Sequence, residues 1–124
     1  MITIGITQFL NIDRLTDFGL FLGDNEGNEV LLPNKYVPKV FEIGEEMNVF
    51  VYLDHEERPV ATTLVPYVVL NEFALLRVNY VNQVGAFLDW GMEKDILEEN
   101  ENNITELMNG LNLINLKNGL RLMI

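Results

Sequence analysis

Side chains that commonly perform catalysis are scarce in this chain. The 124 residues include one histidine and no cysteine, which excludes disulfides, thiolate metal sites and a cysteine nucleophile. The single histidine, His55, lies in an expected turn, and the run 55–58 lacks the second histidine of a zinc-binding helix. The run Asp24–Gly27 lacks the ligand spacing and the terminal glutamate of a calcium loop. We therefore expect a protein that is not an enzyme and that holds no metal or cofactor.

The aromatic side chains are more informative, because one aromatic motif occurs twice. Phe18-Gly19-Leu20-Phe21-Leu22 recurs as Val84-Gly85-Ala86-Phe87-Leu88, at an offset of 66 residues (85 − 19). The similarity continues downstream, where Glu29–Leu31 corresponds to Asp95–Leu97 at the same offset. A repeat of this length is too long for a solenoid unit and predicts two small domains in tandem, residues 1–65 and 70–124.

The composition is that of a folded protein. Its hydrophobic content of 48% excludes a disordered chain. No apolar run approaches the roughly 20 residues that span a bilayer. The first residues lack the basic region, apolar core and cleavage site of a secretory signal. These features predict a cytoplasmic protein with no membrane partner.

Negative charge is in excess in both halves. Residues 1–63 hold four Lys/Arg and eleven Asp/Glu (4 − 11 = −7), and residues 64–124 hold four and eight (4 − 8 = −4), which sum to the net charge of −11. A field of this sign repels a polyanion at long range. Any bound nucleic acid must therefore be held by a local face of the protein.

The first module is expected to consist of five strands. Apolar stretches at 2–15 and 18–22 precede a turn with two glycines and two asparagines, and a short strand follows at 29–32. Prolines then interrupt regular pairing, and we expect Tyr36, Val37 and Phe41 to fold a loop onto the core. Alternation over residues 47–53 predicts a fourth strand, with Phe50 and Tyr52 opposite its core face, and a fifth strand is expected at 58–64.

The second module begins in the same way and then departs from the first. Strands are expected at 73–81, 84–90 and 93–97. Asn103 and Glu106 resemble a capping box, and apolar spacing through Leu111 predicts a short helix. A hairpin around residues 118–119 is expected to follow. This module is either a shortened barrel or an incomplete copy.

Five strands with glycine corners and an interruption after the third are typical of the OB-fold, a small Greek-key barrel. The run Asp17-Phe18-Gly19-Leu20-Phe21 resembles the Asp-Phe-Gly-Ala-Phe signature of the S-one-type RNA-binding domain. Gly85-Ala86-Phe87 resembles it again. Leu31-Leu32 and Gly44-Glu45 stand where that family has a Leu-Val pair and a Gly-Glu turn. The fold class expected is all-β, with tandem OB-fold barrels.

A more specific resemblance lies in three runs of sequence. Residues 29–38, 51–63 and 85–95 resemble the N-terminal part of the bacterial conserved virulence factor B family. Its members have tandem S-one-type domains and a winged-helix domain, bind RNA and influence virulence-factor expression. The chain departs from the family pattern after Leu97. The resemblance implies an RNA-binding protein that regulates gene expression.

The resemblance also implies which residues bind single-stranded RNA. Phe18 and Phe21 correspond to the two phenylalanines that stack on unpaired bases, and Gly19 permits the bend that brings both to one face. Asp54 and Arg58 match an acidic and a basic residue at the last hairpin. There Arg58 would bind phosphate or stack, and Asp54 would orient it.

Further contacts are expected from both modules. Lys35 flanks the proline loop and is a candidate phosphate ligand, with surface solubility as the alternative. In the second module Val84 replaces the first phenylalanine, so that stacking falls to Phe87 and Trp90, with Lys94 as the nearby cation. A core position is the alternative for Trp90.

Two functions follow from these features. The first is binding of single-stranded RNA by aromatic stacking, in which each stacked base contributes about 1–3 kcal/mol. The second is docking of a basic protein partner by an acidic OB-fold module, which the net charge of −11 favours.

Overall fold

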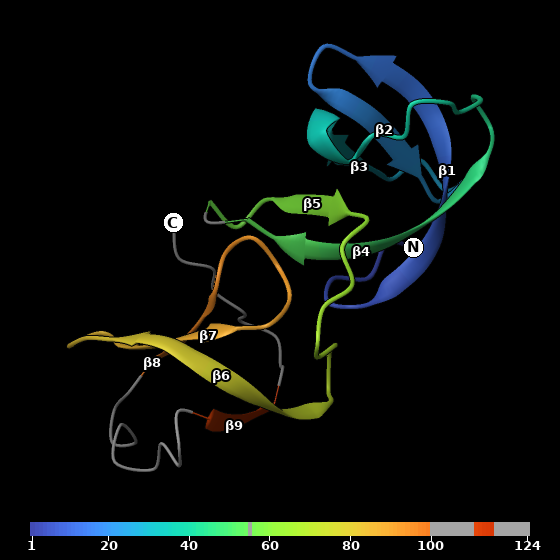
Figure 1. Ribbon diagram of the computed structural model, residues 1–124. Coiled ribbons are helices and arrows are strands. Elements are labelled where there is room, and N and C mark those ends of the chain that lie inside the picture. Colours follow the sequence, from blue (N-terminus) through green and yellow to red (C-terminus); the bar gives the residue numbers. More distant parts are fainter. Residues whose placement is uncertain (55, 100–110, 116–124) are drawn as a thin grey trace. The chain divides into compact units, whose positions relative to one another are not determined.

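Alternating apolar residues and turn-forming glycines and asparagines give an all-β chain (Figure 1). The computed structural model describes residues 1–54, 56–99 and 111–115. They divide into two units, of which the first comprises Met1–Asp54 and Arg58–Leu64 and the second the remaining residues. Within the described part of the chain, no helix has both the length and the apolar character that a membrane crossing requires.

The first unit is a closed barrel of five strands, as expected. Its strands are β1 (Thr7–Thr16), β2 (Gly19–Gly23), β3 (Glu29–Pro33), β4 (Glu46–Leu53) and β5 (Pro59–Thr62). They follow the order β1-β2-β3-β5-β4, and β4 pairs back to β1. The 3-10 turn η1 (Asn34–Tyr36) begins the interruption between β3 and β4. The first strand starts later than expected, because residues 4–6 form a turn in which Gly5 has a φ of +94°.

The barrel encloses one apolar core built from alternate residues of every strand. Its buried members are Leu10, Ile12, Leu20, Leu22, Val30, Leu32, Val49, Val51 and Ala61. The spacing of two within each strand is the pleat periodicity of a sheet with one buried face. Tyr36, Val37 and Phe41 pack against this core, which confirms the expected position of the proline loop.

The bend or bulge expected at Gly19 of β2 is found on the neighbouring strand β1 instead. The β1–β2 register shifts between Ile12 and Arg14, so that Asp13 is a bulge residue, whereas Gly19 pairs with both neighbouring strands without a break. Gly19 is required for a different reason. Its φ is +145°, and a Cβ atom there would lie 2.0 Å from the carbonyl oxygen of Leu32.

The second unit repeats the strand order of the first. It contains β6 (Phe73–Val81), β7 (Gly85–Asp89), β8 (Ile96–Glu99) and β9 (Leu111–Asn115). Their order β8-β7-β6-β9 matches β3-β2-β1-β4 of the barrel. The register shift recurs between Val78 and Tyr80, which lie 66 residues after Ile12 and Arg14 (78 − 12 and 80 − 14). The sequence repeat is therefore also a repeat of strand pairing.

The second unit differs from expectation in its later part. The described strands form a four-stranded sheet rather than a closed barrel. The third strand begins at Ile96 instead of residue 93, because residues 91–94 bend after Gly91, whose φ is +91°. Leu111 was expected to end a helix and instead begins β9. The rest of that helix and the second arm of the hairpin lie outside the described residues.

The tight approach at Gly19 generates a prediction about stability. Gly19→Ala should lower the free energy of unfolding by about 2–5 kcal/mol, because the new methyl group adds overpacking against β3 to the cost of a positive φ. Gly27→Ala is the matched control, since Gly27 also has a positive φ (+93°) but nothing lies within 4 Å of its added Cβ. It should cost about 1–2 kcal/mol. Urea unfolding measures both, and equal losses would contradict the steric account.

Candidate nucleic-acid interface

One row of residues on the outer side of the barrel crosses all five strands. Cross-strand pairs join Arg14, Phe21, Leu31, Val60 and Tyr52 in that order. Phe21 lies between the core residues 20 and 22 and therefore points outward. The four residues other than Arg14 are half-buried and carry apolar or aromatic side chains. These five residues, named here the outer row, form a largely apolar and aromatic strip on the surface of the barrel.

Arg14 covers the ring of Phe21. Its guanidinium carbon lies 4.1 Å from the ring centroid, a cation–π distance. The Nη2 atom of Arg14 also donates a hydrogen bond to Oε1 of Glu29, at 2.9 Å. Phe21 is thus capped by an exposed guanidinium instead of presenting a bare ring to solvent. Sequence reasoning missed Arg14, because the pairing of Arg14 with Phe21 depends on the bulge at Asp13.

Two carboxyl groups lie beside this stack. Partial desolvation, followed by the hydrogen bond to Glu29, raises the pKa of Asp13. The hydrogen bond from Arg14 lowers the pKa of Glu29. Asp13 packs against Gly23, where an added Cβ would come 2.1 Å from its Oδ2 atom. The carboxyl groups of Asp13 and Glu29 therefore lie at the edge of the stack of Arg14 on Phe21, which is named here the Arg14 stack.

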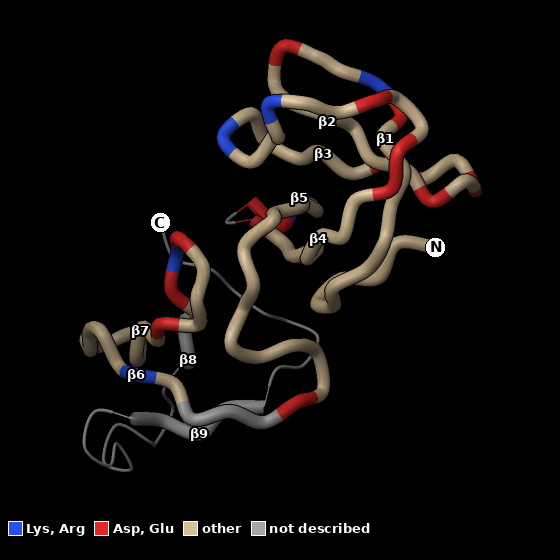
Figure 2. The backbone as a smooth tube through the Cα atoms, turned by 45° about the vertical axis from the view of Figure 1, so that its right-hand side comes forward, with Lys and Arg blue, Asp and Glu red and all other residues tan. Residues whose placement is uncertain are grey.

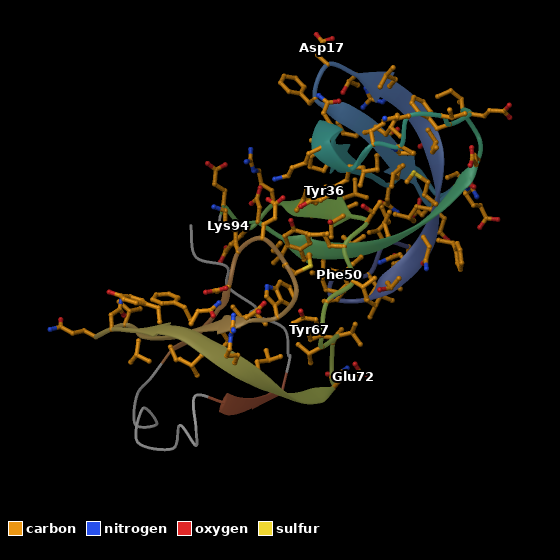
Figure 3. The ribbon with its side chains drawn as sticks, in the orientation of Figure 1. Asp17, Tyr36, Phe50, Tyr67, Glu72 and Lys94 are labelled. Carbon is orange, nitrogen blue, oxygen red and sulfur yellow. The ribbon has the colours of Figure 1, made fainter. Side chains whose placement is uncertain are left out.

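The turn between β1 and β2 holds Phe18 in solvent. Phe18 is 74% exposed. The backbone N–H of Asn34 donates to the carbonyl oxygen of Phe18 at 3.1 Å, and Nδ2 of Asn34 donates to the carbonyl oxygen of Asp17 at 2.6 Å. Figure 3 shows Asp17 at the tip of this turn, with its carboxylate pointing away from the barrel. These bonds fix the turn to η1, so that Lys35 and Phe18 lie at the same end of the barrel.

Lys35 and the aromatic residue after it form a second cation–aromatic contact. The Nζ atom of Lys35 lies 5.4 Å from the ring centroid of Tyr36. Tyr36 packs on the core with part of its ring and is half-buried. The ammonium group of Lys35 therefore lies over the Tyr36 ring, at the end of the barrel that also bears Phe18.

The β4–β5 hairpin places Asp54 against Arg58, as its sequence match implied. The Nε atom of Arg58 donates to Oδ2 of Asp54 at 3.1 Å, and the backbone N–H of Arg58 donates to Oδ1 at 2.9 Å. The backbone N–H of Asp54 in turn donates to the carbonyl oxygen of Arg58, at 2.8 Å. Arg58 is exposed, so this pairing orients its guanidinium without burying it.

Two of the expected stacking residues in the second unit are not accessible, and those predictions are wrong. Phe87 is 7% exposed, because the ring of Tyr80 stacks on it at 5.5 Å between centroids. Trp90 is 0% exposed, and its Nε1 donates to the backbone carbonyl oxygen of Lys94 at 2.7 Å. Trp90 is therefore a core residue, the alternative left open by the sequence. Lys94 itself is exposed.

Basic residues are few and dispersed in the described chain (Figure 2). Two of the four in the first unit, Arg14 and Arg58, lie within 3.1 Å of a carboxylate. Their charge is locally compensated, so a ligand bound to this unit would depend more on ring contacts than on a positive field.

Comparisons with known proteins agree with the fold of the first unit. Residues 4–64 match the family model described as the S1 domain, which is the S-one-type domain expected from the sequence. The chain is 39% identical over 93 residues to the uncharacterized protein YitL of Bacillus subtilis (strain 168), across 74% of this chain and 31% of that protein.

A solved structure is also similar in fold. It is a multidomain protein with nucleic acid binding domains from Streptococcus pneumoniae TIGR4, with a TM-score of 0.70 and 20% identity. The match covers 98% of this chain and 45% of that one. The chain thus spans about a third of the first relative and under half of the second. The conserved virulence factor B family is a finer expectation than these matches and stays a prediction.

The carboxyl groups at the edge of the Arg14 stack predict a pH-dependent stability effect. The raised pKa of Asp13 means that its ionisation destabilises the fold as the pH rises through that pKa. Asp13→Asn should therefore be more stable than the wild type at pH 7, and the gain should vanish as the pH falls below about 4.

The matched control for this effect is the reverse exchange in the second unit. Asn79 corresponds to Asp13 in the repeat (79 − 13 = 66), and Asn79→Asp would create a carboxyl pair with Asp95. It should lower stability at neutral pH. Urea unfolding across the pH range measures both variants, and a gain for Asp13→Asn that is independent of pH would contradict the assignment.

Proposed function

We propose that the barrel of residues 4–64, which matches the S1-domain model, binds single-stranded RNA and performs no catalysis. The observation that carries the proposal is the exposed ring of Phe18 in the signature turn, held by η1 at the end of the barrel that also bears Lys35. The outer row extends the contact surface across the strands, and the Asp54–Arg58 pair adds an oriented guanidinium.

The ligand is expected to be single-stranded because stacking needs an open base. Rings and guanidinium planes bind bases that are unstacked and turned outward, which a duplex does not offer. A single stacked base contributes about 1–3 kcal/mol, so a few such contacts give weak but measurable affinity without a strong positive field. This balance suits a chain with a net charge of −11.

We extend the proposal to the cellular role. The resemblance to the conserved virulence factor B family supports a regulator of gene expression that acts on RNA in the cytoplasm. The Streptococcus pneumoniae protein is described as having nucleic acid binding domains, which supports the ligand class but not the choice of RNA.

The exposed ring of Phe18 gives the most direct test. Phe18→Ala should weaken binding of a labelled single-stranded RNA of about ten nucleotides by about 5- to 150-fold, the loss of one stacked base. Phe9→Ala is the matched control, because Phe9 is 67% exposed but lies on the part of β1 that pairs with β4. Fluorescence anisotropy measures both affinities, and equal affinities for the two variants would refute the stacking role of Phe18.

The phosphate contact of Arg58 predicts a change in salt dependence. Each phosphate neutralised on a single strand contributes about 0.7 to the slope of log K against log salt. Arg58→Gln should therefore reduce the slope by about 0.7 and weaken binding most at low salt. Phe18→Ala should leave the slope unchanged, since a stacked ring releases no counterion. An unchanged slope in Arg58→Gln would place Arg58 outside the phosphate contacts.

The acidic charge favours one other function, the docking of a basic protein. This function predicts that the protein binds a lysine-rich peptide at low salt and loses it at high salt. It also predicts that the protein binds no RNA at any salt concentration.

A further inference from the structure

We infer that the second unit carries its own base-stacking site, formed by Tyr80 on top of Phe87 and named here the Tyr80 platform. The inference rests on the proposed RNA-binding function and assigns stacking in the second unit to Tyr80, a residue that the sequence did not predict. Its ligand is an unpaired base of single-stranded RNA.

The platform occupies the position that the Arg14 stack occupies in the first unit. Each member of the first cluster has a counterpart 66 residues later (for example 80 − 14 and 87 − 21). Asp13, Arg14, Phe21 and Glu29 correspond to Asn79, Tyr80, Phe87 and Asp95. The pairing of Arg14 with Phe21 recurs as the pairing of Tyr80 with Phe87, after the same register shift.

In both units a flat group covers the signature phenylalanine. Arg14 lies 4.1 Å from the Phe21 centroid, and the Tyr80 ring lies 5.5 Å from the Phe87 centroid at an interplanar angle of 17°. Phe87 is buried, whereas Tyr80 is 58% exposed. The surface open to a base is therefore the outer face of Tyr80, supported from below by Phe87.

The polar neighbours of the platform differ from those of the Arg14 stack. Asn79 replaces Asp13, and its Nδ2 donates to the carboxylate of Asp95 at 3.1 Å. The carboxylate of Asp95 is thus bonded to an amide, whereas in the first unit Asp13 and Glu29 are two adjacent carboxyl groups.

A cation lies on the same side of the sheet. Arg77 pairs with Asp89, which is two residues from Phe87 on β7 and therefore on the same face. Arg77 is exposed, with its Nη2 atom 3.8 Å from Oδ2 of Asp89. The face thus presents an open ring with an exposed guanidinium on one side, the combination that binds single strands through base and phosphate.

The test compares the full chain with Tyr80→Leu and Tyr80→Phe. Leucine keeps apolar cover over Phe87 but removes the ring, and phenylalanine keeps the ring and removes the hydroxyl. Anisotropy titration with the same short RNA should show a loss of about 5- to 150-fold for leucine and less than about twofold for phenylalanine. Near-ultraviolet circular dichroism and thermal unfolding establish whether each variant is folded.

A second measurement keeps the inference testable if Tyr80→Leu fails to fold. Wild-type protein is irradiated with single-stranded RNA that contains 4-thiouridine, and the crosslinked peptides are identified by mass spectrometry. Crosslinks within residues 77–84 support the platform. Crosslinks confined to residues 1–64 overturn it.

The outcomes separate this inference from the function on which it rests. If Phe18→Ala weakens binding and folded Tyr80→Leu does not, the Tyr80 platform is overturned and the proposed function stands. If the wild type binds no RNA, both fail. If Tyr80→Leu changes the sedimentation mass of the protein but not its RNA affinity, the ring serves self-association, and the platform is again overturned.

Discussion

Closure of the barrel depends on how β1 is divided between two partner strands. Residues 11–16 of β1 pair with β2, and residues 7–11 pair with β4. A strand that joins two ladders within ten residues needs a strong local twist, and the bulge at Asp13 provides it. The same bulge sets the cross-strand neighbours, so that Arg14 lies over Phe21. The bulge therefore lies where β1 changes partners, and it also sets the makeup of the outer row.

This arrangement determines what kind of binding the first unit supports. Arg14 and Arg58 each form an ion pair, with N–O distances of 2.9 and 3.1 Å, so neither acts as an isolated positive charge. Both guanidinium groups remain exposed, and both are held in defined orientations by hydrogen bonds. A ligand of the proposed kind would therefore be recognised at this face at short range, through shape and ring contact. Long-range attraction of a polyanion would contribute little to such recognition.

Much of the fold could be predicted from local sequence, but the contacts of Arg14 with Phe21 and of Tyr80 with Phe87 could not. Alternation and turn residues predicted the strands of the barrel, and the motif shared by residues 18–22 and 84–88 predicted the repeated pairing. The partners that cover Phe21 and Phe87 depend on a register shift between strands, which no local pattern encodes. Trp90 is fully buried, and neither its type nor its glycine neighbour distinguished this core position from an exposed one.

The antiparallel pairs β1–β2 and β6–β7 have the same register, so the side chains on one pair can be replaced by those of the other without altering the pairing. Residues 7–23 and 73–89 have the same length and the same bulge, and in both the residues after the bulge meet the following strand in the same order. The β1–β2 pair and the β6–β7 pair therefore share the same backbone pairing, whatever side chains they carry. Sequence change within a repeat, or recombination between the two repeats, can therefore replace the guanidinium over the signature phenylalanine by an aromatic ring while the strand pairing is kept. The chain carries both versions, a guanidinium in one copy and a phenol in the other.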